Sequence, residues 1–259
     1  MKGKVFLVGA GPGDVELLTL KALRILESAD VVLHDALVGE DILAMVRPRA
    51  LLVDVGKRVG DKRILQEGIN RMLVQFAASA NVVVRLKGGD PSIFGRAVEE
   101  MAALRAAGIE FEIVPGVTAA TAAAAQAQIA LTDRESASAV VFLTAQQVNG
   151  PASVEAFAKT GTTLAIYMPN RQYREIALHL SAAGLPNDTP CLIVSNASRP
   201  NQELHWTDLA GLTLLSQPQT PALLIIGEVA RHREEGIQAA VLYSVAEADR
   251  AGFRVSNGR

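Results

Sequence analysis

The segment 84–96 contains the residues whose types and spacing best suit the binding of a ligand. An apolar, β-branched run ends in the paired glycines Gly88 and Gly89, an acid follows at Asp90, and an Ala- and Glu-rich stretch begins a few residues later. Glycine lets a ligand approach the backbone closely, and the Asp90 carboxylate can accept hydrogen bonds from an amino group or from hydroxyls. Its competing role is to cap the helix that is expected to follow. Because ligands of open α/β sheets lie at such strand ends, the segment is interpreted as a binding loop.

A second glycine-rich loop, Gly9-Ala10-Gly11-Pro12-Gly13-Asp14, follows the first strand-like run. It has the form of a dinucleotide-binding turn, with Asp35 in the place of a ribose ligand. Two residues oppose a phosphate ligand, because the Asp14 carboxylate would repel a pyrophosphate and Pro12 lacks a backbone N–H. We therefore favour S-adenosylmethionine, which carries no phosphate; NAD, and a tight turn that binds nothing, are the alternatives.

Composition limits the class of protein. The 259 residues are 49% hydrophobic, enough for one large or two medium domains, and 25 basic against 27 acidic residues give a net charge of −2. This charge provides no overall attraction for nucleic acid or an anionic membrane, so neither partner is expected, and an acidic ligand needs locally placed arginines. Since no uncharged apolar run reaches about 18 residues, we expect no membrane span and a cytoplasmic protein.

The cysteine and the histidines do not indicate a metal site. Cys191 is the single cysteine and lies in an apolar, strand-like run, which favours a buried structural thiol over a nucleophile. The four histidines are scattered without the spacing of metal ligands. We expect no protein-bound metal.

Apolar runs alternate with helical stretches, a pattern that predicts an α/β fold with mainly parallel or mixed sheets. Strands are expected over 5–8, 31–33, 51–55, 82–86, 111–114, 139–143, 163–167, 190–194 and 222–226. Helices are expected over 16–28, 64–78, 94–107, 119–130 and 171–183. Pro115-Gly116 interrupts regular secondary structure and predicts a domain boundary. The chain is therefore expected to contain an N-terminal α/β domain (1–115), a C-terminal α/β domain (116–235) and a tail (236–259). The site is expected in the cleft between the two domains.

Five ordered motifs carry a family resemblance. They are the first loop with Leu17-Leu18-Thr19-Leu20-Lys21-Ala22, then His34-Asp35-Ala36-Leu37-Val38, Gly56-Lys57-Arg58, the segment 85–96 with Glu99-Glu100, and the run from Val114 to Ala120. Over residues 4–230 the chain resembles the tetrapyrrole methylases, and among them the uroporphyrinogen-III C-methyltransferases. The resemblance implies two α/β domains with the cofactor in the cleft and a homodimer. It also implies transfer of two methyl groups from S-adenosylmethionine to uroporphyrinogen III, giving S-adenosylhomocysteine and precorrin-2 for sirohaem, cobalamin or haem d1.

The same resemblance implies roles for single residues. Asp35 matches the family's proton acceptor, Lys57 its proton donor, and Arg96 a further catalytic position. From the residues alone, Asp35 could equally stabilise a turn and Lys57 could be a solvated lysine. The positions matching cofactor contacts are Pro12, Gly88, Gly89, Asp90, Ile93, Thr118, Ala119, Met168, Ala197 and Ala222.

A substrate with eight carboxylates requires arginines at the cleft. Arg96 and Glu99 lie three residues apart and are expected to hold each other until substrate arrives; a functionless surface ion pair is the alternative. Arg134 matches another family arginine and is expected to bind substrate.

The chain departs from the family pattern at three places. Asp133 and Gln146 stand where the family commonly has histidines, and the segment 199–203 differs from its usual Thr-Pro-x-Gln-Arg. Asp133 adds a negative charge beside Arg134. Asp133 and Gln146 together leave open a sister methylase that acts on a later precorrin. Equally, both positions could lie outside the pocket and vary freely. A non-catalytic cofactor-binding protein is the remaining alternative.

Overall fold

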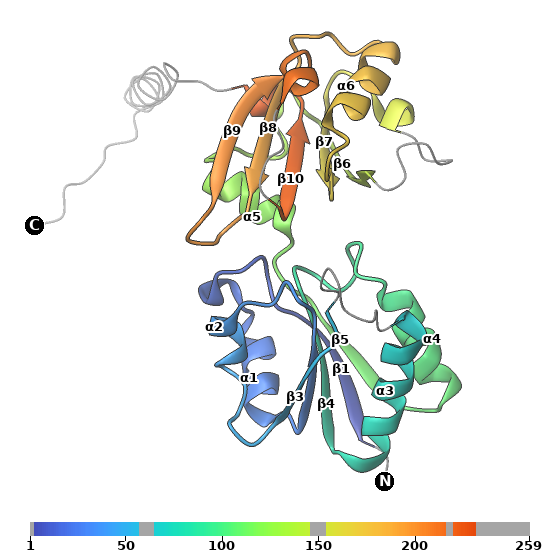
Figure 1. Cartoon of the computed structure of the whole chain (residues 1–259). Helices are drawn as coiled ribbons and strands as arrows, with labels where there is room; N and C mark the ends of the chain where they lie inside the picture. The colour runs from blue at the N-terminus through green and yellow to red at the C-terminus, as the bar shows by residue number, and fades with distance from the viewer. Residues whose placement is uncertain (1–2, 57–64, 146–153, 216–219, 232–259) are drawn as a thin grey trace, which may run out of the picture.

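The computed structural model describes residues 3–56, 65–145, 154–215 and 220–231, which form two five-stranded sheets with helices on both faces of each (Figure 1). The N-terminal sheet has the strand order β3-β2-β4-β1-β5, and every neighbouring pair is parallel. Its strands are β1 (Lys4–Gly9), β2 (Val31–His34), β3 (Leu51–Asp54), β4 (Val82–Lys87) and β5 (Phe111–Val114).

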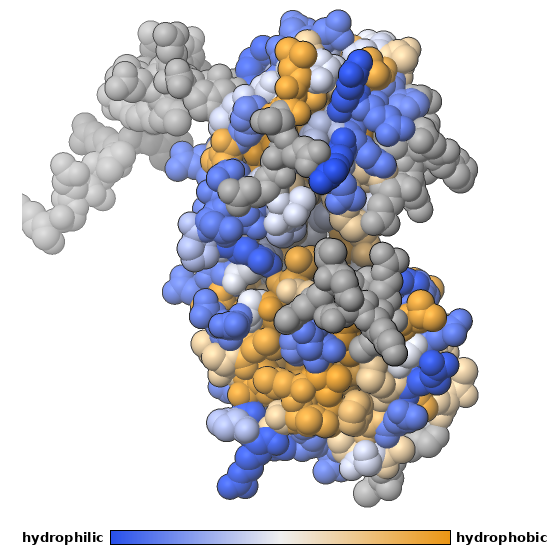
Figure 2. Space-filling view, in the orientation of Figure 1, coloured by the Kyte–Doolittle hydropathy of each residue, from blue (hydrophilic) through white to orange (hydrophobic). Residues whose placement is uncertain are grey.

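The central strands β1 and β4 position both glycine-rich loops. Their Val and Leu residues are buried on both faces, as a parallel sheet covered by helices requires. Gly9, at the end of β1, is in register with Lys87, at the end of β4. The two loops therefore leave the same edge of the sheet side by side. The edge strand β3 leaves Leu51 and Leu52 about half exposed. Figure 2 shows an apolar area on the lower half of the molecule.

Two pairs of helices cover this sheet (Figure 1). On one face lie α1 (Leu20–Ser28) and α2 (Glu40–Leu43), and on the other lie α3 (Gln66–Ser79) and α4 (Ala97–Ala106). The helix expected over 16–28 is divided into the 3-10 turn η1 (Val15–Leu17) and α1, because the Thr19 hydroxyl accepts a hydrogen bond from the Ala22 N–H and begins a new helix.

The helix expected over 94–107 begins later, at Ala97. Phe94 and Arg96 have φ angles of 51° and 56°, in the left-handed region that no α-helix contains. Three residues that were expected in the first helical turn therefore belong to the binding loop.

The C-terminal sheet is mixed and has the order β6-β7-β10-β8-β9. Its strands are β6 (Ala139–Thr144), β7 (Thr162–Tyr167), β8 (Pro190–Ser195), β9 (Glu203–Asp208) and β10 (Ala222–Ile226). Only β6 and β7 are parallel. The helix α5 (Ala119–Gln126) packs on one face, and α6 (Tyr173–Ala182) packs on the other with the short turns η3 (Val154–Phe157) and η4 (Gly211–Leu214). The turn η5 (Glu228–Ala230) follows β10.

The predicted α/β class with mainly parallel or mixed sheets is confirmed; one sheet is parallel and the other is mixed. Cys191 in β8 is fully buried and unpaired, and burial raises the pKa of its thiol. The domain boundary at residue 115 stays a prediction, and the expected tail over 236–259 lies outside the described residues. No described helix has the length and apolar character needed to cross a membrane.

Candidate functional site

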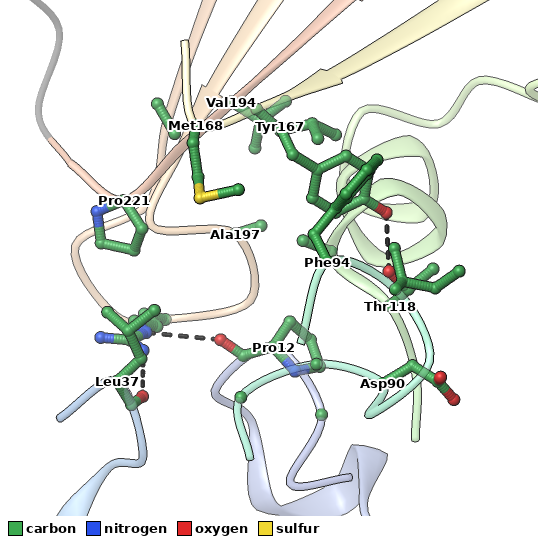
Figure 3. Close-up of a pocket in the computed structure, with 18 residues that line it drawn as sticks. Pro12, Leu37, Asp90, Phe94, Thr118, Tyr167, Met168, Val194, Ala197 and Pro221 are labelled. Atoms are coloured by element: carbon green, nitrogen blue, oxygen red, sulfur yellow. Dashed lines mark hydrogen bonds between the residues drawn. The ribbon is translucent and has the colours of Figure 1, made fainter. Parts of the chain in front are cut away.

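A pocket lies between the two sheets and takes its walls from both (Figure 3). The space between its walls is about 850 Å³, part of it open to solvent. All ten residues expected to contact the cofactor line it. The other lining residues are Gly11, Leu37, Phe94, Tyr167, Val194, Arg199, Pro221 and Leu223.

The floor of the pocket is built from the two glycine-rich loops, which bond to each other. The Gly89 N–H donates to the Gly11 carbonyl at 2.7 Å, and the Gly11 N–H donates back to the Gly89 carbonyl at 3.2 Å. Gly89 has a φ of 68°, which favours glycine. Gly116 also needs a bare α-carbon, because a Cβ there would lie 2.4 Å from the Gly89 carbonyl oxygen. The loops thus form one continuous surface against which a ligand can lie.

Asp90 braces this floor. Its Oδ1 accepts from the Ser92 N–H at 2.7 Å, and its Oδ2 accepts from the Gly116 N–H at 3.0 Å. The alternative that Asp90 caps the following helix is wrong, because Arg96 occupies the N-cap of α4 and makes no side-chain cap bond. Asp90 is also the one anionic side chain among the described residues that line the pocket.

The opposite wall carries an aromatic cluster beneath β7. The ring of Tyr167 lies 5.0 Å from that of Phe94, and its hydroxyl shares a 2.6 Å hydrogen bond with the Thr118 hydroxyl while accepting from the Ala120 N–H at 3.3 Å. Burial raises the pKa of Tyr167. Beside it, the thioether of Met168 points into the pocket (Figure 3).

Arg199 crosses from the C-terminal half to the N-terminal loops. Its Nε donates to the Pro12 carbonyl at 3.4 Å and its Nη2 to the Leu37 carbonyl at 2.6 Å (Figure 3). It is the one cationic side chain among the described residues that line the pocket. Nearby, the Ser198 hydroxyl accepts from the Asp14 N–H, and Asp14 itself caps η1 by accepting from the Glu16 N–H. Sequence reasoning noted the unusual segment 199–203 but gave Arg199 no role.

A buried ion cluster lies next to the floor, under the end of β2. Arg85 donates to the Asp35 carboxylate and, at 2.9 Å, to Glu100 of α4. Lys87 donates to both Glu100 oxygens, at 2.9 and 3.0 Å. Burial, and then the charge of Arg85, lower the pKa of Lys87. The sequence contains one signal for this cluster: two cations at alternate positions of an apolar strand require buried partners.

Three further predicted residues, Arg96, Glu99 and Arg134, do not line the pocket. Arg96 and Glu99 form the expected bidentate pair, at 2.9 and 2.6 Å, and both are about half exposed. Arg134 lies on an exposed turn, and the Asp133 carboxylate braces that turn by accepting from the Ser136 N–H at 2.8 Å. Lys57 and Gln146 lie outside the described residues.

A family model of tetrapyrrole (corrin/porphyrin) methylases matches residues 4–213. The chain belongs to the tetrapyrrole methylases. The siroheme synthase of Actinobacillus pleuropneumoniae serotype 7 is 44% identical to this methylase over 236 residues, which are 90% of the chain and 49% of that protein. The chain thus spans about half the length of the curated relatives it matches.

Two solved structures show the same arrangement of sheets. The uroporphyrin-III C-methyltransferase of Thermus thermophilus, crystallised with S-adenosylhomocysteine, has a TM-score of 0.79 and 37% identity, over 92% of this methylase and 100% of that chain. A cobalt precorrin-4 methyltransferase has a TM-score of 0.78 and 30% identity, over 88% and 96% of the two chains.

Proposed function

We propose that the chain is an S-adenosylmethionine-dependent C-methyltransferase that converts uroporphyrinogen III to precorrin-2 by two successive methylations. The observation that carries the proposal is the pocket between the two sheets, which brings together all ten residues expected to contact the cofactor. The Thermus thermophilus methyltransferase, with the same fold and 37% identity, was crystallised with the demethylated cofactor.

The residues of the pocket fit S-adenosylmethionine. Ile93, Met168 and Val194 offer apolar surface for an adenosine, and the Asp90 carboxylate suits an amino group or ribose hydroxyls. Pro12 contributes no N–H to the floor, so a phosphate would find a poor site there. When bound, the cofactor supplies a methyl group on a sulfonium, and the walls of the pocket orient that group toward the substrate.

Three side chains are proposed to act on the substrate. Asp35 lies at the end of β2, beside the floor, and takes up the proton that leaves the methylated pyrrole. Lys57 is proposed as the proton donor on the family resemblance. Arg96 is proposed to exchange Glu99 for a substrate carboxylate, and Arg134 to bind another.

The direct test is anaerobic incubation of the chain with uroporphyrinogen III and S-adenosylmethionine, followed by mass analysis. The expected product is heavier by two methyl groups, and none should form when the cofactor is omitted. Replacement of Asp35 (D35N) should slow its formation by about 10²-fold, to a rate that can still be measured. The absence of methyl transfer by a folded chain that binds S-adenosylhomocysteine would rule the proposal out.

A second candidate function is methylation of a later precorrin. It is favoured by the similarity to the cobalt precorrin-4 methyltransferase and by Asp133, whose charge lies beside Arg134. Competition between uroporphyrinogen III and precorrin substrates decides between the two, because the true substrate should be turned over faster at equal concentration.

Three other expectations remain predictions. A homodimer is checked by light scattering, and a cytoplasmic location by cell fractionation. Use of NAD is checked by calorimetry, in which S-adenosylhomocysteine should bind and NAD should give no heat. A chain that binds S-adenosylhomocysteine but methylates none of the tetrapyrroles would instead be a non-catalytic cofactor-binding protein.

A further inference from the structure

We propose that Glu100 is a positioning residue, which acts through Arg85 to fix the Asp35 carboxylate at the edge of the site. The inference deepens the proposed function and rests on it, because Asp35 is there the proton acceptor. No role in the reaction as described above requires Glu100, Arg85 or Lys87, yet these three charged residues lie together in the core.

The contacts of Arg85 leave its guanidinium no freedom. Its Nε donates to Glu100 at 2.9 Å, and its Nη1 donates to the Leu86 carbonyl at 3.0 Å. The remaining nitrogen, Nη2, donates to the Asp35 Oδ1. Since a guanidinium is planar, fixing two of its nitrogens determines where the third lies. Glu100 therefore sets the direction from which Asp35 is held.

The burial of the cluster is not explained by stability. The side chains of Glu100 and Arg85 are 0% and 2% exposed. The other members of β4 before Lys87 are valine and leucine, so an apolar residue would suit position 85. Buried ion pairs are commonly no more stabilising than apolar side chains of similar volume. A network that instead ends on a partly exposed carboxylate is arranged to orient that carboxylate.

Lys87 balances the charge of the cluster. Arg85 and Lys87 are positive, and Asp35 and Glu100 are negative, so the formal charges cancel. Without Glu100, two cations would face Asp35 from below, and Arg85 would lose the acceptor of its Nε. Both effects would pull the Asp35 carboxylate toward the core.

Asp35 keeps one side open. Its side chain is 31% exposed, and its Oδ2 accepts no hydrogen bond from any residue in the described part of the chain. Asp35 also donates its N–H to the Leu86 carbonyl, two residues before Gly88 in the floor of the pocket. One oxygen is thus occupied by Arg85, and the other, which has no partner among the described residues, is available to accept a proton from a substrate in the pocket.

The experiment is a double-mutant cycle between Glu100 and Asp35 on the full chain. E100Q keeps the shape of the side chain and removes its charge; we expect kcat to fall about tenfold, with the affinity for S-adenosylhomocysteine within about twofold. In the D35N background, E100Q should lower kcat no further, because its effect passes through Asp35. The control is E110Q, which breaks an exposed ion pair with Lys4 and should leave turnover unchanged.

A readout independent of turnover keeps this test separate from that of the proposed function. The ¹³C NMR signal of the Asp35 carboxyl should move in E100Q and stay in place in E110Q. If E100Q does not fold, R85K replaces it, since lysine keeps the buried charge but lacks the fork that joins Glu100 to Asp35. Failure of the wild-type chain to methylate uroporphyrinogen III would refute only the proposed function. Additive losses in the cycle, or an Asp35 signal that E100Q and R85K leave in place, would overturn the inference.

Discussion

Single side chains of the C-terminal half differ sharply in how their polar atoms are satisfied. The Tyr167 hydroxyl bonds to Thr118 and to the Ala120 N–H, whereas the buried Tyr173 hydroxyl has no partner among the described residues. Cys191 is buried, and burial and then the charge of Asp208 raise the pKa of its thiol. Each difference has a measurable consequence.

The two tyrosines form a matched pair of substitutions. Y167F should lower the free energy of unfolding by about 1–2 kcal/mol, because it removes two hydrogen bonds and leaves the Thr118 hydroxyl and the Ala120 N–H without that partner. Y173F should leave stability unchanged or raise it slightly, since the lost hydroxyl bonds to none of the described residues. Urea unfolding of both variants checks this, and equal losses in the two would contradict the structure.

Because the Tyr173 phenol is buried, we expect the folded chain to lose stability at high pH. Burial raises its pKa from 10.0 to about 12, so the folded chain keeps the phenol neutral while the unfolded chain ionises it. The stabilisation of the folded chain by the neutral Tyr173 phenol is complete below pH 10 and is lost as pH rises to about 12. The free energy of unfolding should fall by at most about 2–3 kcal/mol over this range. Unfolding measured between pH 8 and 12 should show this fall in the wild type and a smaller one in Y173F.

Cys191 should resist thiol reagents in the folded chain. Burial disfavours the thiolate, which is the reactive form. We expect slow labelling by Ellman's reagent under native conditions and one rapid equivalent per chain in denaturant, because the chain has a single cysteine. Rapid native labelling would show that β8 opens locally.

At the scale of elements, the starts of neighbouring strands are held by one carboxylate. Asp30 precedes β2, and its Oδ2 accepts from the Asn81 and Val82 N–H groups at the start of β4, at 3.0 and 2.9 Å. Its Oδ1 accepts from Arg47, which lies between α2 and β3. The Val82 N–H, and then the Asn81 N–H and Arg47, hold the pKa of Asp30 below its usual value of 3.8. This carboxylate therefore fixes where β4 begins relative to β2.

Removing that carboxylate should loosen the N-terminal sheet. D30A is expected to lower the free energy of unfolding by about 1–3 kcal/mol, because two backbone N–H groups lose their acceptor. Folding lowers the pKa of the Asp30 carboxyl in the wild type. The stabilisation that this carboxylate gives the folded chain is therefore present above pH 3.8 and is lost as pH falls further. Chemical denaturation at pH 7 and pH 3 measures both effects, and E110Q, which removes only a surface pair, should change stability by less than about 0.5 kcal/mol.

The elements also show what sequence could predict. Strands with long apolar runs, such as β4 and β8, were predicted to within a residue or two, because burial on both faces determines their composition. The strand β9 was not predicted, since it lies at an edge and its sequence is largely polar. The late start of α4 depends on backbone angles at Phe94 and Arg96 that no residue type dictates.

The residues of the candidate site likewise differ in whether the sequence could predict them. The ten residues expected to contact the cofactor were predicted from loops at strand ends and from the ordered family motifs, and all ten line the pocket. The pairing of Glu100 with Arg85 does not, because it depends on how α4 packs against β4. Arg199 likewise gains its role only when the second sheet is placed above the first.

At the scale of the whole molecule, Arg199 joins the two halves at the mouth of the pocket. R199A removes its hydrogen bonds to the Pro12 and Leu37 carbonyls, and we expect the affinity for S-adenosylhomocysteine to fall about tenfold. R231A is the control, because Arg231 pairs with nearby Glu228 on the same half and does not line the pocket. Calorimetric titration measures the affinity of both variants for S-adenosylhomocysteine. Equal affinities would show that the hydrogen bonds of Arg199 do not contribute to binding.

The shared pocket makes ligand binding and the docking of the two sheets one coupled equilibrium. A ligand that touches Gly89 below and Met168 above binds fully only when the halves are docked. Because the two equilibria are coupled, ligand binding stabilises the docked arrangement by the same free energy by which docking strengthens ligand binding. Saturation with S-adenosylhomocysteine should therefore merge the thermal unfolding of the two halves into a single transition at higher temperature, so that the cofactor acts as a reversible cross-link across the molecule.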